Sequence, residues 1–64
     1  MKILHEYQTP DNSGVRAEVV FDGKTFGCNF YNQGVLIKTE MYEGKSEAWA
    51  ESAAENYVDG IKLL

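Results

Sequence analysis

The stretch from Ser46 to Asp59 predicts one amphipathic helix, and this helix constrains the whole chain of 64 residues. The stretch contains no proline, Ser46 is a typical N-cap, and Gly60 is a typical left-handed stop just after its end. Most of its apolar residues gather on one half of the helix surface, where we expect Trp49 and Tyr57 to be the large anchors. No other stretch predicts a helix, so the rest of the chain has to supply the layer that covers this apolar half.

The preceding residues alternate between apolar and polar side chains, as strands do. Turn residues divide them at Thr9 to Gly14, at Asp22-Gly23 and at Asn32-Gln33-Gly34. The predicted strands span residues 2–8, 15–21, 24–31 and 35–42. We therefore predict an α+β fold in a single small domain, residues 1–64. It is a four-stranded antiparallel β-meander followed by one C-terminal amphipathic helix packed on one sheet face (ββββα, two-layer).

The Asp22-Gly23 pair is typical of a two-residue hairpin loop. Such a loop places Phe21 opposite Lys24 and fixes every later pair: Val19 with Phe26, Ala17 with Cys28, Val15 with Phe30. The apolar residues of both strands then share one face. We expect that face to lie against the helix.

The orientation of the fourth strand depends on the length of the loop before it. A two- or four-residue loop turns four residues toward the helix, namely Val35, Ile37, Thr39 and Met41. A three-residue loop with Gly34 in the left-handed region turns Leu36 inward instead. We favour the first alternative because the other set contains Lys38 and Glu40, which are costly to bury.

The charge balance narrows the choice of partner. Ten acidic residues outnumber six basic ones, for a net charge of −4, which argues against nucleic-acid binding through phosphates and against an anionic membrane surface. A basic protein surface is a compatible partner. The chain has no apolar run of membrane-spanning length, its first residues develop no signal-peptide apolar region, and its lone cysteine fits a reducing compartment. We expect a cytoplasmic protein, in the host cytoplasm if it is viral.

Acidic residues recur at every fourth position of the predicted helix: Glu47, Glu51, Glu55 and Asp59. Successive residues of this set lie about 6 Å apart along the helix axis, so the four form a ridge of like charges. Each neighbouring pair destabilises an isolated helix by roughly a few tenths of a kcal/mol, and only Lys62 beside Asp59 is placed to offset them. The ridge predicts either a solvated face or a docking strip for an Arg- and Lys-rich surface of a larger protein.

The sheet face away from the helix is the second candidate surface. We expect it to carry Tyr31 and Tyr42 interspersed with Arg16 and Lys38. Tyrosine and arginine are enriched at binding hot spots, but cross-strand aromatic pairs also simply stabilise an exposed sheet. Single-strand RNA readers stack bases on aromatic sheet residues, but this chain lacks their motif and their basic surplus.

No pattern predicts catalysis, a cofactor or a metal centre. We expect Cys28 in the core, where a thiol behaves as a small apolar group, and no motif links it to the single histidine, His5. The Gly44-Lys45-Ser46 tripeptide resembles the end of a phosphate-binding loop, but Thr39 stands where that loop needs a glycine. We interpret the tripeptide as a turn followed by a helix cap.

These patterns predict a non-enzymatic protein-binding module that occupies a basic, nucleic-acid-binding surface of a larger protein through the acidic ridge. The layout looks like that of small accessory proteins of phages and mobile elements, including inhibitors of host defence enzymes. That likeness rests on size and arrangement, with no motif behind it. The alternative is a structural or assembly protein that homodimerises through the tyrosine-bearing sheet face or through an apolar tail. The tail, which we also expect to cover an edge of the core, consists of Ile61, Leu63 and Leu64.

Overall fold

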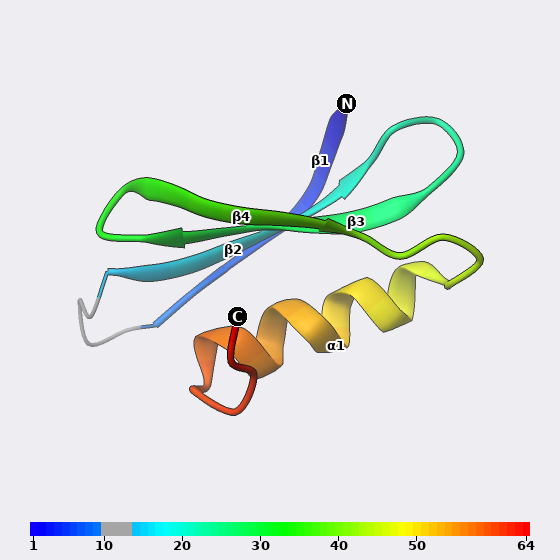
Figure 1. Ribbon diagram of the computed structural model, residues 1–64. Helices are drawn as coiled ribbons and strands as arrows, with labels where there is room; N and C mark the ends of the chain where they lie inside the picture. The colour runs from blue at the N-terminus through cyan, green and yellow to red at the C-terminus, as the bar shows by residue number, and fades with distance from the viewer. Residues whose placement is uncertain (10–13) are drawn as a thin grey trace.

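The computed structural model describes residues 1–9 and 14–64 and shows one antiparallel sheet with a helix across one face (Figure 1). The elements are β1 Lys2–Gln8, β2 Val15–Phe21, β3 Phe26–Asn32, β4 Val35–Met41 and α1 Glu47–Val58. The strands lie side by side in the order β1-β2-β3-β4. The predicted ββββα meander with two layers is therefore confirmed. The predicted turn residues 10–13 lie outside the described residues, within which we find no helix that could cross a membrane.

Both ends of α1 follow the sequence signals. The hydroxyl of Ser46 accepts a hydrogen bond from the backbone N–H of Trp49 at 3.3 Å. At the other end Gly60 adopts a φ of 82°, and the N–H of Ile61 donates to the carbonyl of Asn56 at 2.8 Å. This bond reaches back across the last turn as in a Schellman motif, which needs a residue that tolerates positive φ. The predicted caps are confirmed.

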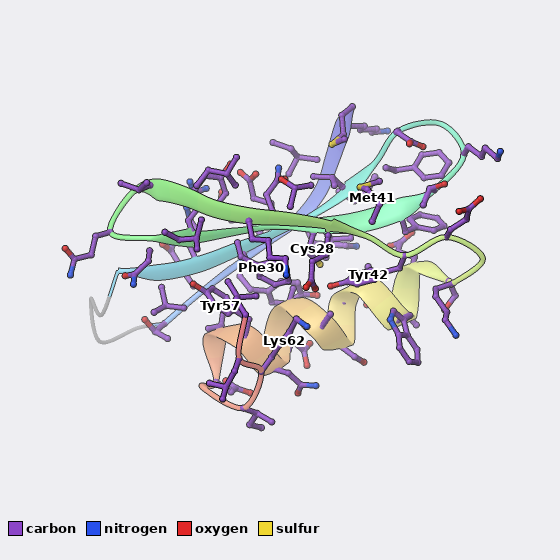
Figure 2. All side chains as sticks on the ribbon, in the orientation of Figure 1. Cys28, Phe30, Met41, Tyr42, Tyr57 and Lys62 are labelled. Atoms are coloured by element: carbon purple, nitrogen blue, oxygen red, sulfur yellow. The ribbon has the colours of Figure 1, made fainter. Side chains whose placement is uncertain are left out.

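The core between the layers is built from small and medium side chains. Its fully buried members come from β2, β3 and α1: Ala17, Val19, Cys28, Phe30, Ala50 and Ala54. Tyr57 packs against Phe30 with ring centroids 4.8 Å apart, as predicted, and Cys28 lies between sheet and helix (Figure 2). Trp49, however, is 52% exposed, with the Lys45 ammonium 4.6 Å from its ring centre. The prediction that Trp49 anchors the helix is wrong because α1 meets the sheet through its alanines and turns the indole outward.

The hairpin of β2 and β3 keeps its predicted faces in a different register. Phe21 pairs with Phe26, where the prediction placed Lys24, and the later pairs are Val19 with Cys28, Ala17 with Phe30 and Val15 with Asn32. The carboxylate of Asp22 accepts hydrogen bonds from the backbone N–H groups of Lys24 and Thr25 at 2.9 and 2.7 Å. These bonds close a longer loop over residues 22–25. Because side chains alternate with a period of two, a shift of two residues leaves each on its predicted face.

The strand β4 begins as predicted and then reverses its faces. Gln33 and Gly34, with φ of 52° and 80°, form a two-residue loop that places Val35 opposite Asn32. Within the strand, a bulge then leaves Ile37 as an extra residue.

The bulge in β4 decides which residues face the helix. Tyr31 pairs with Leu36 before the bulge, and Phe30 pairs with Lys38 after it. The side chains on the helix side beyond it are therefore those of Lys38, Glu40 and Tyr42, while Thr39 and Met41 lie on the open face. The predicted inward set of Ile37, Thr39 and Met41 is wrong because one extra residue inverts the alternation.

The helix covers three strands and leaves the fourth uncovered. Within the described chain the backbone of α1 comes close to β1, β2 and β3 but not to β4. The apolar tail does not fill the gap, since Ile61, Leu63 and Leu64 are 71, 88 and 44% exposed. The prediction that this tail covers the core edge is wrong. Lys62 lies there instead, with its ammonium 5.7 Å from the centre of the Phe30 ring (Figure 2).

Candidate partner-binding surfaces

The acidic ridge, formed by Glu47, Glu51, Glu55 and Asp59, lies on the flank of α1 beside β1. Its first two members have a partner on the strand. Nε2 of His5 lies 2.8 Å from a carboxylate oxygen of Glu47 and 3.3 Å from one of Glu51. The hydrogen bond from His5 is the largest cause that lowers the pKa of Glu47. β1 therefore supplies a hydrogen-bonding partner to the first half of the ridge.

A bulge in β1 brings His5 to the helix. Ile3 pairs with Val20 and His5 pairs with Val19, so Leu4 is the extra residue. Leu4 packs against the core next to His5, whereas Ile3 points to the other face and is 55% exposed. Strict alternation would place Ile3 and His5 on one face of the sheet, but the extra residue puts them on opposite faces, as the bulge does in β4.

The cluster of His5, Glu47 and Glu51 also contains ligand types that divalent metals use. One atom from each residue lies within 4.8 Å of the others, and an imidazole with carboxylates is a familiar zinc donor set. The imidazole already contacts both carboxylates directly, however. Hydrogen bonding accounts for this geometry, and we assign the cluster no metal role.

The second half of the ridge borders a hollow between α1 and β1. The hollow, about 440 Å³ in volume, is lined by Glu55, Asp59, Val58, Glu6 and Tyr7, together with Gln8. Among residues 1–9 and 14–64, neither Glu55 nor Asp59 has an ion-pair partner. Burial, followed by the charges of Glu51 and Glu55, raises the pKa of Tyr7. The hollow is therefore negatively charged and is also lined by the apolar side chains of Tyr7 and Val58.

Lys62, the expected counter-charge for Asp59, forms its ion pair with another residue. Lys62 points away from the ridge, and its ammonium lies 3.1 Å from a carboxylate oxygen of Glu40 on β4. The prediction that Lys62 offsets Asp59 is wrong because the Schellman turn at Gly60 directs Lys62 toward the opposite flank.

The open sheet face carries a polar network centred on Glu18, which is only 6% exposed. Glu18 accepts hydrogen bonds from Arg16, Tyr31 and Asn29 at 3.0, 2.9 and 3.2 Å. Arg16 also lies 4.0 Å over the Tyr31 ring and pairs with Glu6 at 2.9 Å. The hydrogen bond to Glu18 raises the pKa of Tyr31. Arg16 and Tyr31 are thus on the predicted sheet face. There they contact each other and share Glu18 as a hydrogen-bond acceptor.

The other two predicted sheet-face residues lie on the helix side. Lys38 and Tyr42 were expected beside Arg16 and Tyr31, and this placement is wrong because of the bulge at Ile37. Tyr42 packs against the core, and its hydroxyl donates to Glu40 at 2.8 Å (Figure 2). Lys38 lies 3.3 Å from the same carboxylate. The predicted site is therefore divided between the two faces of the sheet.

A groove that sequence reasoning missed runs between β4 and α1. Its volume is about 700 Å³, and its walls include Trp49, Ala53, Tyr42, Ile61 and Lys62. The groove exists because α1 stops short of β4 and because Trp49 is turned outward. The exposed apolar tail was its one sequence signal, since residues of this kind need either a core or a partner.

No known protein family, curated protein or solved structure matches this chain. Its function therefore has to be inferred from two unequal flanks. One is the acidic ridge beside β1, and the other is the apolar groove and edge beside β4.

Proposed function

We propose that this chain is a non-enzymatic binding module whose acidic ridge holds a basic segment of a larger protein. The observation that carries the proposal is the pair formed by Glu55 and Asp59. Both side chains are exposed, both border the hollow beside β1, and neither has an ion-pair partner in the described chain. Like charges one helical turn apart destabilise a helix slightly, and a bound cation would reverse that effect.

The hollow suits a long basic side chain better than a free ion. The half-buried Tyr7 and Val58 form its apolar floor. Lysine and arginine bury an aliphatic stem on such a surface while their charged end stays beside carboxylates. Arginine fits best because its planar guanidinium bonds two carboxylate oxygens at once and stacks on an aromatic ring.

The two halves of the ridge would contribute unequally. His5 already pairs with Glu47 and Glu51, so a basic partner gains less there. Glu55 and Asp59 should dominate the affinity, and the whole ridge should speed association at low salt. If the basic surface normally holds nucleic acid, its occupation excludes that nucleic acid. The module would then act as an inhibitor, in the manner expected of a phage or mobile-element accessory protein.

The test compares Glu55→Gln/Asp59→Asn with a control of equal charge change. Two neutralisations raise the net charge by two, as does Glu43→Lys, and Glu43 is an exposed residue lining the groove on the opposite flank. Each variant is first shown to be folded by circular dichroism. Proteins are then captured from a lysate of the source cell, or of its host if it is viral.

We expect partners with a basic surface to bind the wild type and the Glu43→Lys control and to be lost with the double variant. Two exposed charge pairs are worth about 0.4–2 kcal/mol together, which corresponds to roughly a 2- to 30-fold loss of affinity. Capture should also weaken as salt is raised. Equal capture by all three proteins would refute the proposal.

A further inference from the structure

The strand β4 forms a free edge of the sheet that is rich in exposed aliphatic side chains. Val35, Leu36 and Ile37 are 60, 51 and 53% exposed, and Met41 is 38% exposed. In the part of the chain that the structure describes, the sheet ends at β4 and α1 does not approach it. Stable proteins normally cover or pair such an edge, because its unpaired backbone groups and apolar side chains invite another strand.

The hydrogen bond between Tyr42 and Phe26 shows which backbone groups of β4 point outward. The N–H of Tyr42 donates to the carbonyl of Phe26 at 2.8 Å, so Tyr42 directs its N–H toward β3. Backbone direction alternates along an antiparallel strand. The backbone groups of Lys38 and Glu40 therefore also point toward β3, and those of Thr39 point away from the sheet.

We infer that a second copy of this chain pairs with β4 in antiparallel orientation about Thr39, so that two four-stranded sheets become one continuous sheet. Thr39 then lies opposite Thr39 of the partner subunit, and Lys38 lies opposite Glu40 of the partner subunit. Ile37 meets Met41 of the partner subunit on the open face. The inference does not depend on the acidic ridge, which lies on the other flank.

The charges of β4 select this register among its neighbours. A two-fold pairing that keeps outward backbone groups facing each other can move only in steps of two residues. One step in one direction places Lys38 opposite Lys38 of the partner subunit. One step in the other direction places Glu40 opposite Glu40 of the partner subunit. Like charges directly opposite each other are destabilising, whereas the register about Thr39 makes both pairs complementary.

This pairing also brings the grooves of the two subunits next to each other. A two-fold axis perpendicular to the sheet keeps each face on its own side, so both helices lie below the shared sheet. The grooves between β4 and α1 then open toward each other, with the exposed Trp49 and Ile61 along their walls. A helix placed under β4 would obstruct this arrangement, and none lies there in the described chain.

Disulfide trapping tests the register directly. Opposed residues of an antiparallel pair have Cα atoms about 4.5–5.5 Å apart, which a disulfide can bridge. Cys28 is fully buried and does not compete. Under mild oxidation Thr39→Cys should give a dimer that reductant separates. The control Lys24→Cys, at an exposed site in the loop of residues 22–25, should stay monomeric. A Thr39→Cys variant that does not cross-link overturns the inference.

A charge swap tests the same register without cross-linking. Sedimentation equilibrium would compare the wild type with Lys38→Glu, with Lys38→Glu/Glu40→Lys, and with Lys24→Glu as the control of equal charge change. We expect Lys38→Glu to raise the dimer dissociation constant about tenfold, because two favourable pairs become repulsive. The swapped variant should return to the wild-type value, and the control should stay near it.

Three further results, all from sedimentation, would overturn the inference. The first is a wild type that stays monomeric at the highest concentration, as expected if a strand of another protein occupies this edge. The second is equal weakening by Lys38→Glu and Lys24→Glu, and the third is a swapped variant that does not recover. Glu55→Gln/Asp59→Asn should leave the dimer unchanged, so this inference and the proposed function can fail separately.

Discussion

Each edge strand of the sheet contains one bulge, but the two bulges have opposite effects on the surface that the edge exposes. A bulge at Leu4 in β1 directs His5 toward α1, where it pairs with carboxylates in water-exposed surroundings. A bulge at Ile37 in β4 turns Lys38 and Glu40 inward and leaves aliphatic side chains outside. One extra residue per strand therefore decides whether an edge shows charge or apolar surface.

The charges on the two flanks also differ in burial. On the β1 flank the side chains of His5 and Glu47 are 43 and 42% exposed, so solvent screens their attraction. On the β4 flank Glu40 is 21% exposed and has Lys38, Lys62 and Tyr42 around it. Burial raises the pKa of Glu40, but hydrogen bonds from Tyr42 and Lys62 outweigh it and hold the pKa below its usual value. We therefore expect the larger effects on stability at β4.

The largest effect should follow from moving β4 away from β3. A Cβ added to Gly27 would lie 2.5 Å from the carbonyl oxygen of Glu40 and 2.5 Å from Sδ of Met41. The methionine can move, but the backbone carbonyl cannot. Gly27→Ala should lower the free energy of unfolding by about 1–3 kcal/mol in urea titrations. The control Asn29→Ala lies on the same face of β3 and should cost less, because it loses only exposed or partly exposed hydrogen bonds. Equal losses would show that β3 and β4 tolerate a wider spacing.

The second-largest effect on stability should appear only at alkaline pH, where Cys28 and Tyr42 begin to titrate. Burial raises the pKa of the Cys28 thiol from 9.0 to about 11 and likewise raises the pKa of Tyr42. The folded chain thus binds these protons more tightly than the unfolded chain. Their contribution is complete below about pH 9 and is lost as the pH rises toward 11, with a loss of about 2 kcal/mol from the thiol.

Urea midpoints between pH 8 and 11 would measure this loss, with Cys28→Ala as the comparison. The variant is less stable throughout because it leaves a small cavity. Its stability should nevertheless fall less steeply over the same range, because one titrating group is gone. Parallel curves for the two proteins would contradict the raised thiol pKa.

A smaller effect should come from the lysine that closes the β4 flank. Lys62 pairs with Glu40 at 3.1 Å and lies over the ring of Phe30. Lys62→Gln should lower the free energy of unfolding by about 0.5–1 kcal/mol. It should also raise the pKa of Glu40, which carboxyl NMR would follow. Lys45→Gln removes a contact with the exposed Trp49 and should change the stability less. A larger loss of stability from Lys45→Gln than from Lys62→Gln would contradict the stabilising role given to Lys62.

The structural features that could be predicted from the sequence are those that depend on local chemistry. The caps at Ser46 and Gly60 act within a few residues, so the helix limits could be predicted. The faces of β2 and β3 could also be predicted, because a register error of two residues leaves the alternation intact. The buried position of Cys28 followed from that alternation.

What failed depends on single extra residues and on contacts distant in sequence. Neither bulge has a glycine or proline to mark it, so the inward positions of Lys38 and Tyr42 were missed. The contact of His5 with Glu47 joins residues 42 positions apart and depends on the bulge at Leu4. The course of α1 across three strands depends on how its alanines pack, which periodicity does not specify.

The smallest effect should come from the β1 flank, where removal of His5 exposes the like charges of the ridge. His5→Ala should lower the free energy of unfolding by less than Lys62→Gln does, because the pair is solvent-exposed. The pKa of Glu47 should rise toward its ordinary value, because the hydrogen bond from His5 is what chiefly lowers it. In the wild type this contribution is present above the ordinary pKa of Glu47 and is lost as the pH falls through the lowered one. Carboxyl NMR titration would measure the shift, with Lys2→Ala in the same strand as the control. An unchanged Glu47 pKa would mean that the ridge is free of β1 in solution. All four acidic residues, rather than Glu55 and Asp59 alone, would then be available to a basic partner.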